Sequence, residues 1–372
     1  MKYSAFFIIF AFLMTSCSTS FLKYDKEDQL KKNDEFDEKV KIVDPSATPA
    51  PGAAVTAQPA PTPSPSPSPS PSPTPAAGKT SRKKSSKKSK SAKKSRGKRP
   101  SPEVTPASES GATAVATTEA AITRRQPDLE DDEGFKGRRP VVDPFHVGEE
   151  VVHDVSYFKV SAGELRMKVA PYATVDGKKS YNFKMAISTS PLFSSFYSVE
   201  DSVDIFMDYD SLVPSVFQLH VKESGQLRES KMLFKDNAAN FWEKKVTKKD
   251  GVEEKKDTWD ILPFTQSVYS AVFYMRFFKW EVGKEYSFRV ANEKENLVFS
   301  GKALRKEVLD TKLGPMNAIV IQPNITLKGK FKPIGENLIW LSDDDRHYIL
   351  RIEAKIKIGT LVSQVVEIKP GK

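Results

Sequence analysis

Few residues in this chain are spaced for catalysis or metal binding. The four histidines, His146, His153, His220 and His347, lie far apart, and no histidine-glutamate helix motif or other close ligand spacing accompanies them. The serine-rich stretch 188–195 has no neighbouring base, and both the Gly-Xaa-Ser-Xaa-Gly elbow and a phosphate-binding loop are absent. We therefore expect a protein that is not an enzyme and that has no cofactor and no metal site.

Two charged features of the second half of the chain have a structural and a functional interpretation. Asp343, Asp344 and Asp345 form its densest acidic cluster; carboxylates at a strand turn can hold calcium, but a solvated hairpin turn is the interpretation we favour. Arg276 lies within an otherwise apolar segment. A buried arginine needs a carboxylate or carbonyl partner, and we expect Asp343 or Asp344 to supply it.

Cys17 is the only cysteine, and it follows an apolar run that begins after a short positive start. Leu-Met-Thr-Ser-Cys at residues 13–17 resembles a bacterial lipobox, in which the thiol is diacylated and the chain is cut before it. Two or three acyl chains anchor a protein stably. Because Ser18 follows, the resemblance implies an outer-membrane anchor facing the periplasm. The alternative is an ordinary cleaved signal with an incidental cysteine.

The formal charge of +10 is concentrated in one tract. Residues 79–99 contain twelve of the 58 Lys and Arg residues and no acid, so the remainder, with 46 basic and 48 acidic residues, is close to neutral. The tract has no aromatic residue to stack on bases, so we expect no specific nucleic-acid binding. It suits an anionic wall polymer or lipopolysaccharide, through Lys83, Lys84, Lys87, Lys88, Lys93 and Lys94. The alternative is a solvated linker.

The first 140 residues divide into a signal and a linker. Residues 1–16 are the predicted signal peptide, and residues 17–140 the predicted lipidated anchor and disordered linker, rich in Pro, Ser and Lys. Residues 18–44 are mostly charged, so we expect at most a transient helix there. Alternate prolines over residues 59–75 favour a stiff polyproline II spacer. This organisation predicts a long tether between the membrane and the folded domain.

Residues 141–372 are predicted to form one all-β domain. Period-two alternation, typical of half-buried strands, recurs at Leu165, Met167 and Val169, at Phe183, Met185 and Ile187, and at Leu350, Ile352, Ala354, Ile356 and Ile358. About twelve such strands, separated by turn signals, predict an antiparallel sheet curled into a barrel-like or spiral shape.

Residues 265–278 break the strand pattern. Apolar residues recur there at helical spacing, with Thr265 as the expected N-cap. Aromatic residues cover a second side, so we expect a helix buried on more than one face against the concave sheet. Core packing is the favoured interpretation. The alternative is an apolar ligand site formed by Tyr269, Phe273, Tyr274, Arg276 and Phe277.

The motifs of residues 144–369 resemble the bacterial envelope domain of unknown function 3108. The matching stretches are Gly148-Glu149, residues 162–164, 210–214, 282–283, 314–318, 339–344 and 358–361, together with Ser267, Ala271, Tyr274 and Arg276 in the helix. The resemblance implies an antiparallel β domain at the periplasm or outer membrane, and no known activity. We expect a non-enzymatic lipoprotein whose domain binds an apolar ligand or an envelope protein; the alternative is a structural or adhesive module that binds wall polymer or lipopolysaccharide through its basic tract.

Overall fold

The computed structural model describes residues 21–47, 139–248, 251–292, 294–327, 330–332, 337–356 and 359–372. These residues belong to one compact unit whose centre is a single large sheet, curled but not closed. The predicted all-β fold with a buried helical segment is confirmed.

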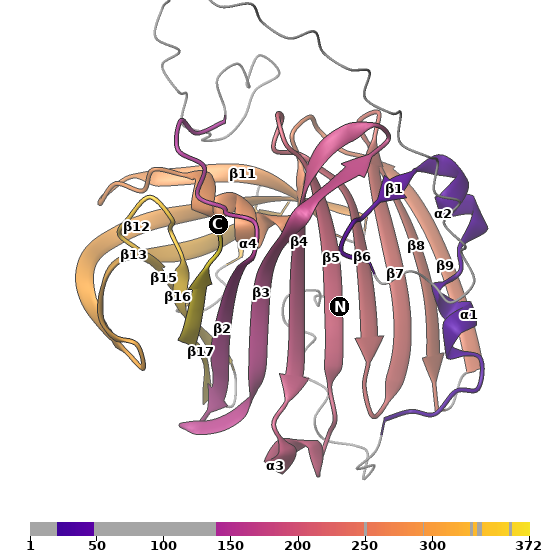
Figure 1. Ribbon diagram of the computed structural model, residues 1–372, viewed down its shortest axis with the longest axis horizontal. Coiled ribbons are helices and arrows are strands. Elements are labelled where there is room, and N and C mark those ends of the chain that lie inside the picture. Colours follow the sequence, from indigo (N-terminus) through magenta and orange to yellow (C-terminus); the bar gives the residue numbers. More distant parts are fainter. Residues whose placement is uncertain are drawn as a thin grey trace, which may run out of the picture. The chain divides into compact units, whose positions relative to one another are not determined.

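Eight consecutive strands form an antiparallel meander in which each strand pairs with the next, and they lie side by side in Figure 1. They are β2 (Glu149–Tyr157), β3 (Val160–Val175), β4 (Lys178–Thr189), β5 (Glu200–Asp208), β6 (Pro214–Lys222), β7 (Gln226–Lys235), β8 (Ala238–Thr247) and β9 (Gly251–Asp260). The short helix α3 (Pro191–Ser194) connects β4 to β5. The alternating residues of β3 and β4 lie in strands, as predicted.

The later strands extend the same sheet from the other side of β2. They are β10 (Gln266–Ser267), β11 (Glu285–Asn292), β12 (Glu295–Thr311), β13 (Gly314–Leu327), β14 (Lys330–Lys332), β15 (Leu338–Ser342), β16 (Ile349–Ile356) and β17 (Gly359–Pro370). Strand β17 pairs with β2 and joins the two halves. Strand β10 pairs in parallel with β11, whereas the other pairs are antiparallel. The structure has more strands than the predicted twelve, partly because it includes strands too short to leave a pattern in the sequence. Strands β1 and β10 have only two residues each.

The helical segment begins later than its sequence pattern predicts. Helix α4 covers Ser270–Tyr274 and continues as a 3-10 turn, η1 (Met275–Phe277). Thr265 is not its N-cap; its hydroxyl donates to the carbonyl of Leu262. Instead Ser267 and Ser270 cap each other, because each hydroxyl accepts a hydrogen bond from the other residue's backbone N–H, at 2.9 and 2.8 Å. The two residues of β10 are already paired as strand, which delays the helix.

A segment that we call the strap, residues 21–47, packs on the sheet. It contains α1 (Glu27–Lys31), α2 (Asp34–Lys39) and β1 (Ile42–Val43), and β1 pairs with the end of β3. This differs from the expected transient helix. The strap has few apolar residues, but Leu30 and Phe36 are 4% and 1% exposed, because strands nearly two hundred positions later supply their partners.

The strap and α4 lie on opposite faces of the sheet. Phe36 packs with Leu233 and Trp242, whereas Met232 and Phe241, the preceding residues, belong to the core that contains α4. Successive side chains of a strand point to opposite faces. We call the α4 side the inner face and the strap side the outer face. Both faces of the middle strands are therefore covered.

The end of the strap and the residues before β2 contact adjacent residues of β4. At the end of the strap, Asp44 accepts a hydrogen bond from the side-chain amide of Asn182 at 2.8 Å. Arg139, which precedes β2, donates to the hydroxyl of Tyr181 at 2.7 Å. Asp44 and Arg139 therefore contact neighbouring residues of one strand.

Candidate functional site

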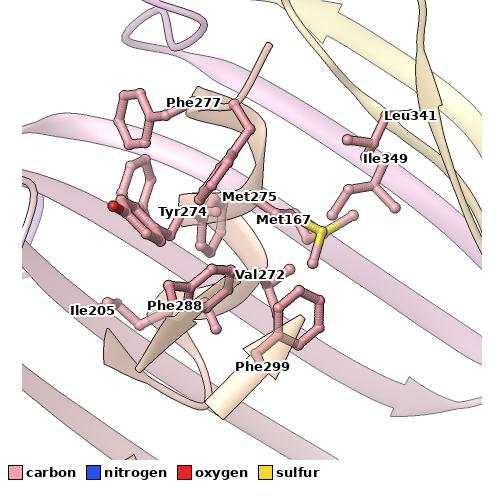
Figure 2. Close-up of a cluster of buried hydrophobic side chains, with 14 of the residues drawn as sticks. Met167, Ile205, Val272, Tyr274, Met275, Phe277, Phe288, Phe299, Leu341 and Ile349 are labelled. Carbon is pink, nitrogen blue, oxygen red and sulfur yellow. The ribbon is translucent and has the colours of Figure 1, made fainter. Parts of the chain in front are cut away.

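The aromatic rings of α4 and η1 fill the inner face. Phe273 stacks on Phe183, with ring centroids 4.2 Å apart and planes 7° apart. Phe277 meets the edge of Phe145 at 5.0 Å. Both side chains and that of Tyr274 are at most 2% exposed, and Figure 2 shows Tyr274 and Phe277 within this cluster. Three of the five predicted ligand-binding residues therefore lie in the packed core.

Tyr269 lies at the edge of this core and lines a small cleft. Its ring meets Phe217 edge-on at 5.0 Å. We call this space the α4 cleft; it is lined by Phe217, Leu219, Arg228, Ser230, Met232, Phe241, Glu243, Val268, Tyr269, Ala291 and Asn292. Its volume is about 30 Å³, which is room for only a few water molecules. A larger molecule would enter only if the lining side chains moved apart.

A polar group lies within the otherwise apolar lining of the α4 cleft. Arg228 Nη1 is 3.5 Å from Glu243 Oε2, and the hydroxyl of Ser230 donates to that oxygen at 3.3 Å. Arg228 Nε is buried and has no hydrogen-bond partner among the described residues. A buried N–H without a partner is costly. Arg228 lines the cleft, so a rearrangement of its side chain would be needed to offer this buried donor to an acidic or carbonyl group that enters.

Two buried carboxyl groups lie at the start of β5 and in the β6–β7 turn. Asp201 and Glu223 are each 7% exposed. Burial, together with the charge of Glu223, raises the pKa of Asp201 to about 8. Glu223 accepts hydrogen bonds from the Tyr197 hydroxyl at 2.6 Å and the Gln226 amide at 2.8 Å. Asp201 therefore holds a proton near neutral pH. No pattern in the sequence marks this pair, because its residues are 22 positions apart and meet only through strand pairing.

Arg276 takes part in an ion-pair cluster that we call the Glu149 clasp. Glu149 Oε1 accepts from Arg276 Nη1 and Glu149 Oε2 from Arg346 Nη2, both at 2.6 Å. Arg276 also donates to the carbonyl of Arg346 at 2.9 Å, and its guanidinium lies 4.3 Å from the centre of the Phe145 ring. The clasp joins the start of β2, the helical segment and the β15–β16 turn.

The predicted partners of Arg276 were wrong. Asp344 accepts hydrogen bonds from the hydroxyl of Ser342 and from the backbone N–H groups of Arg346 and His347, so it shapes the β15–β16 turn. Asp343 pairs with Lys306 at 2.8 Å. Arg276 lies over the turn and reaches its backbone carbonyl, while the carboxylate comes from Glu149, 127 residues earlier.

The histidines occupy four separate environments. His153 is buried in the core; its Nε2–H donates to the carbonyl of Ile349 at 2.8 Å, so Nδ1 accepts from Ser363. Burial lowers the pKa of His153 to about 4. His146 contacts Arg346, His220 contacts Glu229, and His347 donates to the carbonyl of Arg276. Within the described residues no three His, Cys, Asp or Glu side chains gather as a metal site would require.

Several predicted functional residues lie outside the described residues. They are Cys17 and the basic-tract residues Lys83, Lys84, Lys87, Lys88, Lys93 and Lys94. Their predicted roles remain predictions. Among the helices in the described part of the chain, none is long and apolar enough to span a membrane.

Comparison with known proteins identifies the folded part. Residues 152–366 match the family model described as "Protein of unknown function (DUF3108)". No curated protein matches the chain. The family match begins within β2 and ends within β17. It includes the residues that line the α4 cleft and Arg276 and Arg346 of the clasp, whereas Glu149 lies before its first residue.

Three solved structures resemble the sheet at low identity. A β-barrel-like protein of domain of unknown function DUF1849 from Brucella abortus has a TM-score of 0.38 and 9% identity, over 60% of this chain and 97% of that one. A candidate exported protein with a YmcC-like fold from Bacteroides fragilis has a TM-score of 0.28 and 9% identity, with coverages of 61% and 97%. A candidate lipoprotein from Parabacteroides distasonis has a TM-score of 0.24 and 10% identity, with coverages of 60% and 95%.

Proposed function

Because the chain belongs to the DUF3108 family, whose function is unknown, we propose its function from the site: it is a non-enzymatic envelope lipoprotein whose domain binds an amphiphilic ligand in the α4 cleft. The observation that carries the proposal is the unpartnered Nε of Arg228 beside an apolar lining. An acidic or carbonyl head would satisfy this donor, while an apolar body would contact Phe217, Leu219 and Tyr269.

The N-terminal sequence supports placing the protein in the envelope. Cys17 closes a lipobox-like sequence, and the strap begins a few residues later. We propose that acylated Cys17 holds the protein at the outer membrane, with the domain in the periplasm. There the domain would meet molecules with acyl chains, which would enter the cleft when its lining side chains move apart.

The ligand is tested by native mass spectrometry and lipid extraction of the full-length protein purified from its envelope in mild detergent. We expect a stoichiometric adduct of lipid size. The strap must be retained, since residues 141–372 alone would expose the outer-face surface that Phe36 and Leu30 cover.

Two variants and one control identify the site. The Arg228→Met change should weaken the adduct by about 10- to 100-fold, the value of one charge-assisted hydrogen bond. The Val268→Phe change should exclude the ligand by filling the cleft. The control is Arg305→Met, which removes an arginine that pairs with Glu307 on β12, away from the cleft lining. A clean mass for the unmodified protein would contradict the proposal and favour the adhesive alternative, in which the basic tract binds an anionic polymer.

A further inference from the structure

The sheet presents its exposed aromatic side chains at one of its ends. Among the described residues only two aromatic side chains are largely exposed, Phe158 and Phe196, at 69% and 70%. Phe158 lies in the β2–β3 turn and Phe196 follows α3, which Figure 1 shows at the lower end of the sheet. Leu192, within α3, is 61% exposed. Single exposed apolar residues are common, but exposed aromatic rings gathered at one end call for an explanation.

The backbone brings these side chains to neighbouring turns. In an antiparallel meander the β2–β3 and β4–β5 connections lie at the same end. Ser190, just before α3, donates its N–H to the carbonyl of Ala162 at 2.9 Å and its hydroxyl to the carbonyl of Ser161 at 3.0 Å, so α3 is fixed beside the start of β3.

The β2–β3 turn keeps a strained backbone that exposes an aromatic ring. Phe158 and Lys159 have φ values of +49° and +63°, a conformation that favours glycine or asparagine in two-residue hairpins. A bulky ring at such a position is uncommon. Phe158 nevertheless occupies this position at an exposed tip, and a contact outside the domain would explain why.

The strap brings the membrane anchor to this same end. The N–H of Leu22 donates to the carbonyl of Glu223, in the β6–β7 turn, at 3.1 Å. That turn lies at the end of the meander that also carries the β2–β3 turn and α3. Leu22 is five positions after Cys17, and five residue steps reach at most about 18 Å. An acyl chain on Cys17 therefore keeps this end of the sheet close to the lipid.

We propose that Phe158, Leu192 and Phe196 form a membrane-docking surface that inserts into the lipid layer beside the acyl anchor. The proposal rests on the anchor of the proposed function and adds a second contact, which fixes how the domain stands on the membrane. The occupant is lipid because the short connection to Cys17 leaves the surface next to acyl chains. The opposite end, with the β5–β6 turn and the clasp, then faces away from the bilayer.

The test uses full-length lipidated protein in vesicles of phosphatidylethanolamine and phosphatidylglycerol. The Leu192→Cys variant is labelled with an environment-sensitive fluorophore; acylated Cys17 leaves no other thiol. The matched control is Leu262→Cys, which is 55% exposed and follows β9 at the opposite end, beside Asn237. We expect the label at 192, and not at 262, to shift to the blue, to lose access to aqueous iodide and to be quenched by lipids labelled in the upper acyl chain.

Three other results would overturn the proposal. Equal iodide access at positions 192 and 262 in vesicles shows that the end stays in water. Shielding at 192 in detergent without vesicles, rising with protein concentration, shows contact with a second copy. Shielding that appears only when envelope extract is added shows a protein partner.

A second measurement separates this surface from the anchor. If Cys17 is not acylated, mass spectrometry shows an unmodified thiol and the anchor fails by itself. In a protein that begins at Ser18, without the signal segment and Cys17, the docking surface acts alone, and the additional Phe196→Asp change should then reduce binding to the same vesicles by about tenfold. Unchanged binding would refute the surface even if the anchor is present.

Discussion

The Glu149 clasp gives the sharpest prediction of stability. The Glu149→Gln change keeps the size of the side chain but removes the negative charge between two guanidinium groups. The side chains of Glu149 and Arg276 are 2% and 3% exposed, and that of Arg346 is 17% exposed. Water can therefore compensate Arg346 in part, whereas Arg276 keeps an uncompensated buried charge.

The expected cost follows from that burial. Removing one partner of a buried ion pair destabilises a protein by about 3–5 kcal/mol. In a domain of this size each kcal/mol lowers the melting temperature by about 2–4 °C, so the Glu149→Gln protein should melt about 6–20 °C lower. Replacing Glu149 by Leu together with Arg276 by Met removes both charges and should cost less than Glu149→Gln alone.

The adjacent residue provides a matched control. Glu150 pairs with Arg166 at 2.7 Å and with Lys369 at 3.3 Å at the surface, and surface pairs contribute about 0–1 kcal/mol. Calorimetry and urea unfolding of Glu149→Gln and Glu150→Gln, at one pH and salt concentration, measure the difference. If the two variants unfold at the same temperature, burial of the charge does not determine the stability of the clasp and the reasoning is refuted.

Three further predictions concern the strap and the two shifted titrations. Phe36→Ala should cost about 3–5 kcal/mol of strap docking, so trypsin should cut the strap more than about 100-fold faster and Trp242 emission should shift to the red. The pKa of His153 falls to about 4 on folding, so stability is lost as pH falls from about 6.5 and about 2 kcal/mol is missing at pH 5; urea unfolding of His153→Gln should lack this slope. The pKa of Asp201 rises to about 8, so stability is lost as pH rises from about 4 to about 8, and Asp201→Asn should gain about 3–4 kcal/mol over the parent protein between pH 4.5 and 7.5.

Local patterns were sufficient to predict the strands that bury one regular face. Met167 and Phe183 alternate with polar residues, and both point to the inner face of β3 and β4. The helical segment was also recognisable, because its apolar residues recur at helical spacing. The first residue of the helix could not be predicted, because Ser267 belongs to strand β10 and pairs with Ala291 of β11.

The strap was not predictable from composition. Leu30, Phe36 and Val40 stand among charged residues, and no local pattern indicates that they are buried. Their partners, such as Trp242, lie about two hundred residues away. A few apolar side chains that each enter a preformed site can fix a segment that would not fold alone.

The sequence predicts which residue types form the site, but it does not predict which residues they contact. A buried Arg276 required a carboxylate, but the pairing of β2 with β17 and the course of η1 select Glu149. Likewise the aromatic spacing predicts a buried segment, yet only the packing shows that Phe273 lies in the core while Tyr269 lines the cleft. Arg228 lies on a strand in which polar and apolar residues alternate in the ordinary way, so nothing in the sequence marked it as a site residue.

The position of the strap determines which bonds would join the domain to the acyl anchor proposed at Cys17. The covalent path from Cys17 to β2 passes through residues 48–138, but the contacts of the strap on the outer face bypass it. We expect a protease cut between Ser46 and Arg139 to give a two-chain protein in which the strap stays bound to the sheet, so that the proposed anchor at Cys17 would still hold the domain. A force applied at Cys17 would act first on the hydrogen bond of Leu22 and on the packing of Phe36. It would therefore detach the strap from the sheet before it reached residues 48–138.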